Sequence, residues 1–257
     1  MAEHGEGWLE RVAKRRFLER WRARADAAPQ MELDALRRLR REARQLVQPL
    51  QRFLHHADGR LALPLAEHAE VRLPRRADWG WRPELWSGPI RPRGAVAPDP
   101  GARLGSEAQI FHDAAEPELT FRQLRNHRPE DVAPFGVALE VYRFAGSFLS
   151  LAIELPPAAI EGLTRQHIVA VETVIDYEAP IEMFLRLNIR HGPNTEQIVR
   201  EIDMRTRAAV TDFDLAYSRI NERRLERAWL DVIFEAPRMN AVVLRELAVT
   251  RRLRLPL

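Results

Sequence analysis

The spacing of apolar residues changes along this 257-residue chain, and that change constrains the fold more than any other feature. Near the front, Leu9, Ala13, Phe17 and Trp21 recur at every fourth position, which is typical of one face of a helix. From residue 135 onward apolar and polar residues alternate instead, as in residues 137–144. Such alternation is typical of a strand with one buried face. The sequence therefore predicts helices followed by antiparallel β-sheet.

Two helices are predicted in the first 58 residues. The first runs from about Trp8 to Ala28 and is closed by Pro29. The second begins near Met31, and its apolar residues follow one another at spacings of 3, 4, 3, 4 and 3, which is a coiled-coil rhythm: Leu36, Leu39, Ala43, Leu46, Leu50 and Phe53. Pro49 has no amide hydrogen and clashes with the preceding turn, so the helix should kink or end near Gln48.

This arm is predicted to serve oligomerisation or docking through five residues of that seam: Leu36, Leu39, Leu46, Leu50 and Phe53. Packing on the first helix, on the rest of the chain or on a second copy would each satisfy the same apolar stripe. Arginines interleaved with glutamates at helical spacing indicate a solvent-exposed face. Since basic residues only slightly outnumber acidic ones here, nucleic acid is not expected as a partner.

The rest of the chain, residues 59–257, is predicted to form an antiparallel β-sandwich of jelly-roll type. Asp58-Gly59 is a turn signal, and short strands are expected at 61–65 and 69–73. A long irregular loop follows at about 74–104. Residues 137–144 and 147–155 read as a hairpin joined by a tight turn at Ala145-Gly146. Further strands are expected at 167–177, 181–190, 196–202, 210–217, 228–234 and 242–250.

Composition excludes several functional classes. The chain has no cysteine, so disulfides and cysteine nucleophiles are excluded, and assembly in a reducing cytoplasm fits. No apolar stretch approaches the roughly 18 to 20 residues of a membrane span, and no secretory signal is recognised. The phosphate-binding and dinucleotide-binding glycine motifs are absent. The histidines are scattered, with His112-Asp113 the nearest approach to a ligand pair, so neither a metal nor another cofactor is expected.

Three of the six tryptophans lie in the long loop: Trp79, Trp81 and Trp86. Together with Arg82 they are the candidate binding residues, because aromatic rings stack on sugars while arginine hydrogen-bonds hydroxyl groups. A protein–protein contact is a second interpretation, since Trp and Arg are enriched at interfaces. The third is purely structural, in which the tryptophans fix the loop onto the sandwich.

Asp212 and Asp214 are placed on one face of a predicted strand, with Phe213 on the other. Their separation is close to that of the paired carboxylates of glycosidases. Lectin-like calcium sites also gather carboxylates with an asparagine, and Asn188 or Asn194 could supply one. A solvated strand face balanced by arginines such as Arg205 and Arg219 is the simplest interpretation.

Three phrases, residues 146–151 (GSFLSL), 187–194 (LNIRHGPN) and 229–240 (WLDVIFEAPRMN), together with the arginine-rich front, resemble an uncharacterised alphaproteobacterial family. That family is associated with the head-spike base of phage-like gene transfer agents. The resemblance implies a non-enzymatic structural protein on capsid vertices, oligomeric and five-fold. It also implies contact with a capsid protein and with a spike fibre protein that supports attachment to cell-surface polysaccharide. Such a protein would be cytoplasmic during assembly and then on the particle surface.

The leading hypothesis is therefore an assembly and adhesion component of a phage-like particle. A stand-alone carbohydrate-binding β-sandwich is the first alternative, and a glycan-active enzyme that uses Asp212 and Asp214 is the second. No residue roles follow from the resemblance, so the candidate sites depend on the residues alone.

Overall fold

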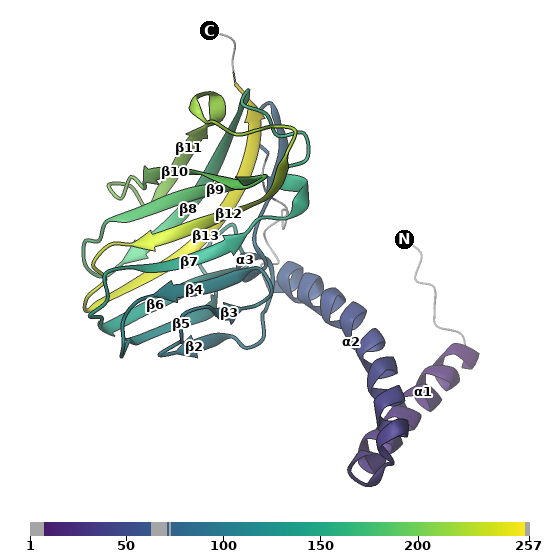
Figure 1. Cartoon of the computed structure of the whole chain (residues 1–257). Helices are drawn as coiled ribbons and strands as arrows, with labels where there is room; N and C mark the ends of the chain where they lie inside the picture. The colour runs from purple at the N-terminus through teal and green to yellow at the C-terminus, as the bar shows by residue number, and fades with distance from the viewer. Residues whose placement is uncertain (1–7, 63–70, 72, 255–257) are drawn as a thin grey trace. The chain divides into compact units, whose positions relative to one another are not determined.

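A computed structural model describes residues 8–62, 71 and 73–254, and the chain divides into two compact units, residues 1–53 and 54–257 (Figure 1). The first unit is helical, and the second is a β-sandwich together with the last turns of a helix. The boundary predicted between the arm, 1–58, and the sandwich, 59–257, lies a few residues later in the chain, inside the same helix.

The helical unit contains α1 (Trp8–Ala27), a short 3-10 turn at Ala28–Gln30 and the first part of α2 (Leu33–Ala62). Of the kink or end predicted for the second helix near Gln48, the end is wrong, because α2 continues through Pro49. The predicted turn at Asp58-Gly59 is also helical. Within the second unit, burial of Gly59 and Ala62 compensates for the turn-forming tendency of this dipeptide.

The β-sandwich consists of two antiparallel sheets, as predicted (Figure 1). Across the seven-stranded sheet the order is β11 (Ala208–Asp214), β8 (His167–Tyr177), β13 (Asn240–Leu253), β6 (Phe135–Arg143), β5 (Glu118–Arg125) and β2 (Gly94–Val96), with β1 (Ala77–Trp81) also paired to β13. Across the six-stranded sheet it is β10 (Asn194–Glu201), β9 (Met183–His191), β12 (Leu225–Phe234), β7 (Leu149–Glu154), β4 (Ala108–His112) and β3 (Ala102–Leu104).

The predicted hairpin between 137–144 and 147–155 is wrong, because β6 and β7 belong to different sheets. The connection is held by Asp113, whose carboxylate accepts hydrogen bonds from the backbone N–H groups of Ser147 and Phe148 at 2.7 and 3.2 Å. The side chain of Phe144 is also buried in the core, which favours a path of the chain from one sheet to the other. A two-residue turn signal therefore marks a crossover between layers here.

The predicted loop at 74–104 contains regular structure: β1, α3 (Glu84–Ser87), β2 and β3. Strands β4 and β5 were not predicted. Of the two short strands expected after the arm, Leu61 and Ala62 of the first are helical. The rest of that segment, and most of 69–73, lie outside the described residues. Among the described helices, none is long and apolar enough to cross a membrane.

The core lies between the two sheets and is built from the inward-facing side chains of both. Phe121 on β5 and Phe234 on β12 meet edge to face, with ring centroids 6.1 Å apart, and so link the two layers. The alternating burial of β4, β5 and β8 follows from the strand pleat, which turns successive side chains to opposite faces.

Strand β13 changes its hydrogen-bonding partner along one edge. It pairs with β6 over Asn240–Leu244 and with β1 from Val249 to Arg252. Between these ladders the carbonyl of Leu244 accepts a 2.9 Å hydrogen bond from the Trp86 indole Nε1, and the carbonyl of Arg245 accepts one of 2.9 Å from the Asn126 amide. Side chains thus satisfy the backbone groups that the two strands leave unpaired.

The same gap holds a buried ion pair. Arg82 donates from Nε and Nη2 to the two carboxylate oxygens of Glu246, at 2.8 and 3.1 Å, and both side chains are nearly inaccessible to solvent. Burial raises the pKa of Glu246, and the Arg82 guanidinium opposes that change. The two-point contact fixes the segment that leads into α3 against the middle of β13.

We expect Trp86→Ala to lower the free energy of unfolding by about 3–5 kcal/mol, because it leaves a cavity in the core and an unpaired Leu244 carbonyl. Urea unfolding followed by far-ultraviolet circular dichroism measures this change. Tyr142→Ala, at a side chain that is 56% exposed on the neighbouring strand β6, is the matched control and should change stability by less than about 0.5 kcal/mol. Equal effects of the two substitutions would contradict the assignment of Trp86 to the core.

Candidate functional site

The tryptophan segment is attached to the sandwich. Trp86 is fully buried and Arg82 is paired with Glu246, so neither side chain lies at the surface where a ligand would meet it. Trp79 and Trp81, on β1, are half-buried, stack with ring centroids 6.4 Å apart and pack against the core. This arrangement fits the structural interpretation of the cluster and leaves only the exposed parts of Trp79 and Trp81 for contact with a partner.

Asp212 and Asp214 lie on β11 with Phe213 buried between them. Asp212 accepts a 2.6 Å hydrogen bond from Arg252, and Asp214 lies 3.3 Å from Arg254 and accepts a bond from a backbone N–H group. The arginines that balance them are therefore neighbours on β13 and just beyond it, rather than Arg205 and Arg219.

The asparagines considered for calcium binding do not join this pair. Asn188 is buried on β9 in the other sheet, and Asn194 begins β10. In the part of the chain that the structure describes, no group of three or more His, Asp or Glu side chains is arranged to hold a metal ion.

A polar and aromatic group lies on the outer face of the six-stranded sheet. We call it the β9–β12 face and define it by Arg186, Asn188, Gln197, Arg227, Trp229 and Asp231. Strand pairing aligns these residues in rows, because Asn188 stands opposite both Gln197 and Trp229 while Arg186 stands opposite Asp231. Neighbours in a row point to the same side of the sheet.

Hydrogen bonds fix the polar members of the β9–β12 face. Asp231 is 3% exposed, and its Oδ2 accepts from the Arg186 Nε and the Asn188 Nδ2, each at 2.8 Å. The Gln197 amide donates to the Asn188 Oδ1 at 3.1 Å. Shared bonds of this kind hold the donors and acceptors in place before any ligand arrives.

Trp229 supplies the aromatic part of the β9–β12 face. The guanidinium carbon of Arg227 lies 4.7 Å from the centre of its ring, in a cation–π contact. Ala152 stands beside Asp231 in the pairing with β7, so a small side chain adjoins the network on that side. The sequence carries a signal for this face, Arg-x-Asn on β9 and Trp-x-Asp on β12. The signal was missed because the two motifs lie about forty residues apart and come together only when β9 and β12 pair.

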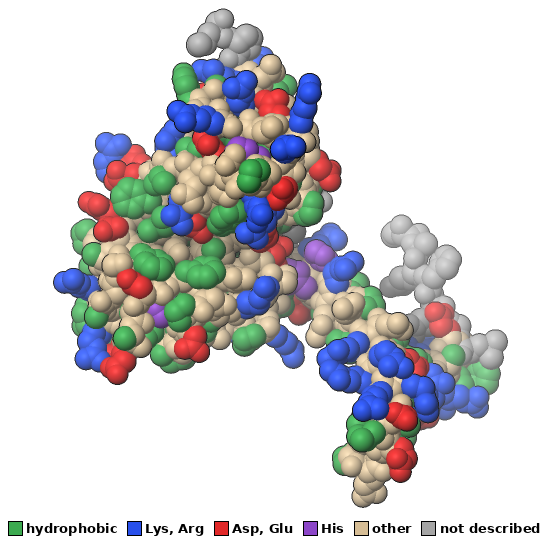
Figure 2. Space-filling model, in the orientation of Figure 1, with side chains coloured by type: hydrophobic (Ala, Val, Ile, Leu, Met, Phe, Trp, Pro, Cys, Tyr) green, Lys and Arg blue, Asp and Glu red, His purple; other side chains and the backbone are tan. Residues whose placement is uncertain are grey.

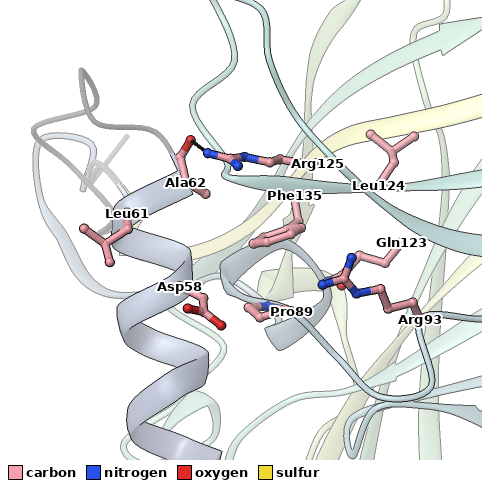
Figure 3. Close-up of a pocket in the computed structure, with 9 residues that line it drawn as sticks. All are labelled: Asp58, Leu61, Ala62, Pro89, Arg93, Gln123, Leu124, Arg125 and Phe135. Carbon is pink, nitrogen blue, oxygen red and sulfur yellow. Dashed lines mark hydrogen bonds between the residues drawn. The ribbon is translucent and has the colours of Figure 1, made fainter.

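A second candidate is a pocket of about 310 Å³ between the last turns of α2 and the edge of the seven-stranded sheet (Figure 3). Its lining comes from four segments of the second unit: Asp58, Leu61, Ala62, Pro89, Arg93, Gln123, Leu124, Arg125 and Phe135. One hydrogen bond joins two of the lining segments: the Arg125 guanidinium on β5 donates to the Ala62 carbonyl on α2 at 2.7 Å. The mixture of charged and apolar walls suits a small polar ligand.

Two glutamates join α3 to the turn between β3 and β4. The Glu107 Oε2 accepts a 2.7 Å hydrogen bond from the backbone N–H of Glu84. In return the Glu84 Oε1 accepts bonds from the backbone N–H groups of Ser106 and Glu107. Burial, with a further contribution from the negative charge of Glu84, raises the pKa of Glu107 to about 7. The contact is structural, but it makes the sandwich sensitive to pH.

The whole chain, residues 1–257, matches a family of unknown function (DUF6478) and therefore belongs to it. The family description names neither a gene transfer agent nor a capsid. No curated protein matches the chain.

Among solved structures, the enzymatically active domain of tailspike protein 4 of bacteriophage CBA120 is 7% identical, with a TM-score of 0.40 over 58% of this chain and 19% of that one. The family 11 carbohydrate-binding module of Clostridium thermocellum, in complex with a mixed-linked tetrasaccharide, is 7% identical, with a TM-score of 0.38 over 60% and 95%. The C-terminal family 22 module of the Clostridium thermocellum xylanase Xyn10B is 9% identical, with a TM-score of 0.32 over 69% and 93%.

These neighbours are mainly carbohydrate-binding β-sandwich modules, and this chain spans less than a fifth of the tailspike domain.

The raised pKa of Glu107 gives a prediction for pH. Folding favours the protonated carboxyl, so its contribution to stability is complete below about pH 4.5, its ordinary pKa, and is lost as the pH rises through about 7. Glu107→Gln mimics the protonated form and keeps an acceptor for the Glu84 N–H. At pH 8 we expect it to raise the free energy of unfolding by on the order of 2 kcal/mol, with little change at pH 4.5.

Thermal melts at the two pH values measure this difference, and Glu116→Gln, at an exposed glutamate of a nearby loop, is the control. A gain that is the same at both pH values would show that charge at position 107 is not its cause.

Proposed function

We propose that this chain is a non-catalytic binding and assembly protein, in which the β9–β12 face binds carbohydrate and the helical unit makes contacts with other subunits. The observation that carries the carbohydrate proposal is the fixed row of Arg186, Asn188 and Asp231 beside Trp229. Sugars offer hydroxyl groups in fixed directions and a C–H face that packs on an aromatic ring. The accessible side chains of Arg186 and Gln197 and the ring of Trp229 present these partners, while the buried Asp231 and Asn188 hold Arg186 and Gln197 in place.

The charge of the β9–β12 face favours a neutral glycan. Asp231 balances Arg186 at 2.8 Å, and Arg227 lies 3.7 Å from Glu154 of β7. Because these charges are matched within the protein, hydrogen bonding and stacking dominate recognition. The paired state of Asp212 and Asp214, each beside an arginine, argues against the glycan-active enzyme, since a general acid must exchange its proton freely with substrate.

The helical unit supports the assembly role. None of its described side chains is buried, and the predicted seam on α2 remains open within the unit, with Leu50 60% and Phe53 68% exposed. Leu36, Leu39 and Leu46 are half-buried. Figure 2 shows lysine and arginine side chains gathered on the same unit, so the apolar seam is flanked by charge. Two helices with this much exposed apolar surface gain stability by packing on a partner.

We extend the proposal to a phage-like particle, on the basis of the sequence resemblance to the head-spike base of gene transfer agents. There the helical unit would contact the capsid or fellow subunits around a five-fold axis, together with the spike fibre protein. The sandwich would face cell-surface polysaccharide. The protein would be cytoplasmic until the particle is assembled and would then lie on its surface.

The glycan site is tested with an array of neutral bacterial surface polysaccharides, followed by calorimetry on the best ligand. We expect Trp229→Ala to weaken binding about tenfold or more, through loss of stacking, while circular dichroism stays unchanged. Tyr142→Ala, which removes an exposed aromatic side chain from the other sheet, is the matched control and should bind like the parent chain. Undiminished binding by Trp229→Ala would exclude the β9–β12 face as the site.

The assembly role is tested by light scattering of the full chain after size-exclusion chromatography. We expect a closed oligomer that the double variant Leu50→Glu, Phe53→Glu reduces to the 29.7 kDa monomer, because two charges then interrupt the apolar seam. Arg52→Ala changes an exposed residue between them and should leave the oligomer intact. A parent chain that is monomeric at high concentration would contradict self-assembly through this surface.

A further inference from the structure

The pocket at the end of α2 contains charged groups that no other described residue pairs with. Among the described residues, neither the guanidinium of Arg93 nor the carboxylate of Asp58 makes a hydrogen bond or an ion pair. Figure 3 shows both side chains directed into the pocket from opposite walls, with Pro89 between them. Arg125 uses one nitrogen on the Ala62 carbonyl and keeps other donors. Two cations and one anion leave the pocket with a net charge of one positive unit.

The apolar part of the pocket is a compact surface. The ring of Phe135 is 7% exposed, and Pro89 lies beside it. Gln123 also lines the pocket, and its amide group is bonded to the backbone. Its amide nitrogen donates to the carbonyls of Leu85 and Gly88, and its oxygen accepts from the Ile90 N–H. A ligand therefore meets apolar groups, Phe135 and Pro89, next to an amide whose donors are already engaged.

Close backbone contacts hold the walls of the pocket in place. A Cβ atom at Gly59 would overlap the carbonyl oxygen of Ser87, and one at Gly88 would overlap the carbonyl oxygen of His55. The His55 ring also lies within hydrogen-bonding distance of the Pro89 carbonyl, at 3.3 Å. The last turns of α2 thus pack directly on the segment that supplies Pro89 and leads to Arg93, and the pocket needs little ordering before it binds.

We propose that this pocket binds the carboxylate of an acidic sugar, a hexuronate residue. The planar guanidinium of Arg93 matches the two oxygens of a carboxylate, and Arg125 adds positive charge to the same pocket. The Asp58 carboxylate accepts hydrogen bonds from ring hydroxyl groups on the opposite side. The exposed edge of the Phe135 ring receives the C–H face of the sugar. The net charge of the pocket complements that of one uronate.

This inference deepens the proposed carbohydrate-binding function and depends on it for the class of ligand, but it concerns a different surface. The β9–β12 face is balanced in charge and suits neutral sugars, whereas the pocket has an uncompensated positive charge. Arg93 follows β1 and α3 in the chain and precedes β2 of the seven-stranded sheet, and Trp229 lies in the six-stranded sheet. Substitutions at the two places therefore test the two proposals separately.

The experiment is calorimetric or saturation-transfer titration of the full-length protein with D-galacturonate and D-glucuronate. We expect binding of a uronate that weakens as salt is added. Arg93→Ala should weaken it at least tenfold, and Arg93→Lys should restore only part of the affinity, because a lysine lacks the two-point geometry. Arg91→Ala removes the same charge two residues away, outside the pocket lining, and should bind like the parent chain. Asp58→Asn should reduce the preference for uronate over acetate.

Three results would overturn the proposal. D-galactose or D-glucose binding as tightly as its uronate would show that the carboxylate is not recognised. Inorganic phosphate binding more tightly than either uronate would replace the ligand class. A lower melting temperature of Arg93→Ala without ligand would show that Arg93 already pairs within the protein. Trp229→Ala should still bind uronate, even if neutral glycans bind to neither protein. Failure of the proposed function and failure of this inference are therefore distinguishable.

Discussion

Strand β13 changes partner in the middle of the seven-stranded sheet, and the arrangement of the second unit depends on how that break is filled. A carbonyl group buried without a partner costs on the order of 1–3 kcal/mol, so the fold needs donors at this point. The Trp86 indole and the Asn126 amide provide them, and Arg82 anchors the same segment on Glu246. These contacts set the position of α3 and of the chain that follows it to Pro89.

The two candidate sites depend on this framework in different ways. The β9–β12 face is built on paired central strands, so its geometry follows from sheet register alone. The pocket joins four segments of the chain and exists only because α2, the segment after α3, β5 and the start of β6 are held together. A site of the first kind tolerates changes in loops. A site of the second kind is sensitive to the packing around Gly59 and Gln123.

The fold class followed from the sequence because apolar periodicity is a local property, and the strand at 167–177 was predicted with the observed bounds. Which strands pair with one another was harder to predict from the sequence. The tight turn at Ala145-Gly146 suggested a hairpin, but a distant carboxylate, Asp113, determines where the chain goes. Trp86 and Trp229 illustrate the same limit for the sites. Both are tryptophans near arginines in the sequence. Only the tertiary packing of α3 shows that the first is core, and only the register of β12 shows that the second is half-exposed on the outer face of its sheet.

The contact between Gly59 and the Ser87 carbonyl has a genetic consequence. Every missense change of a glycine codon by a single base introduces a residue with a β-carbon, and here that atom has no room. The same holds for Gly88 against His55. Any amino-acid substitution at either glycine therefore introduces a steric clash, whereas the exposed arginines of α2 can be replaced without one. Comparison of family members should thus reveal two fixed glycines beside a rapidly changing helical surface.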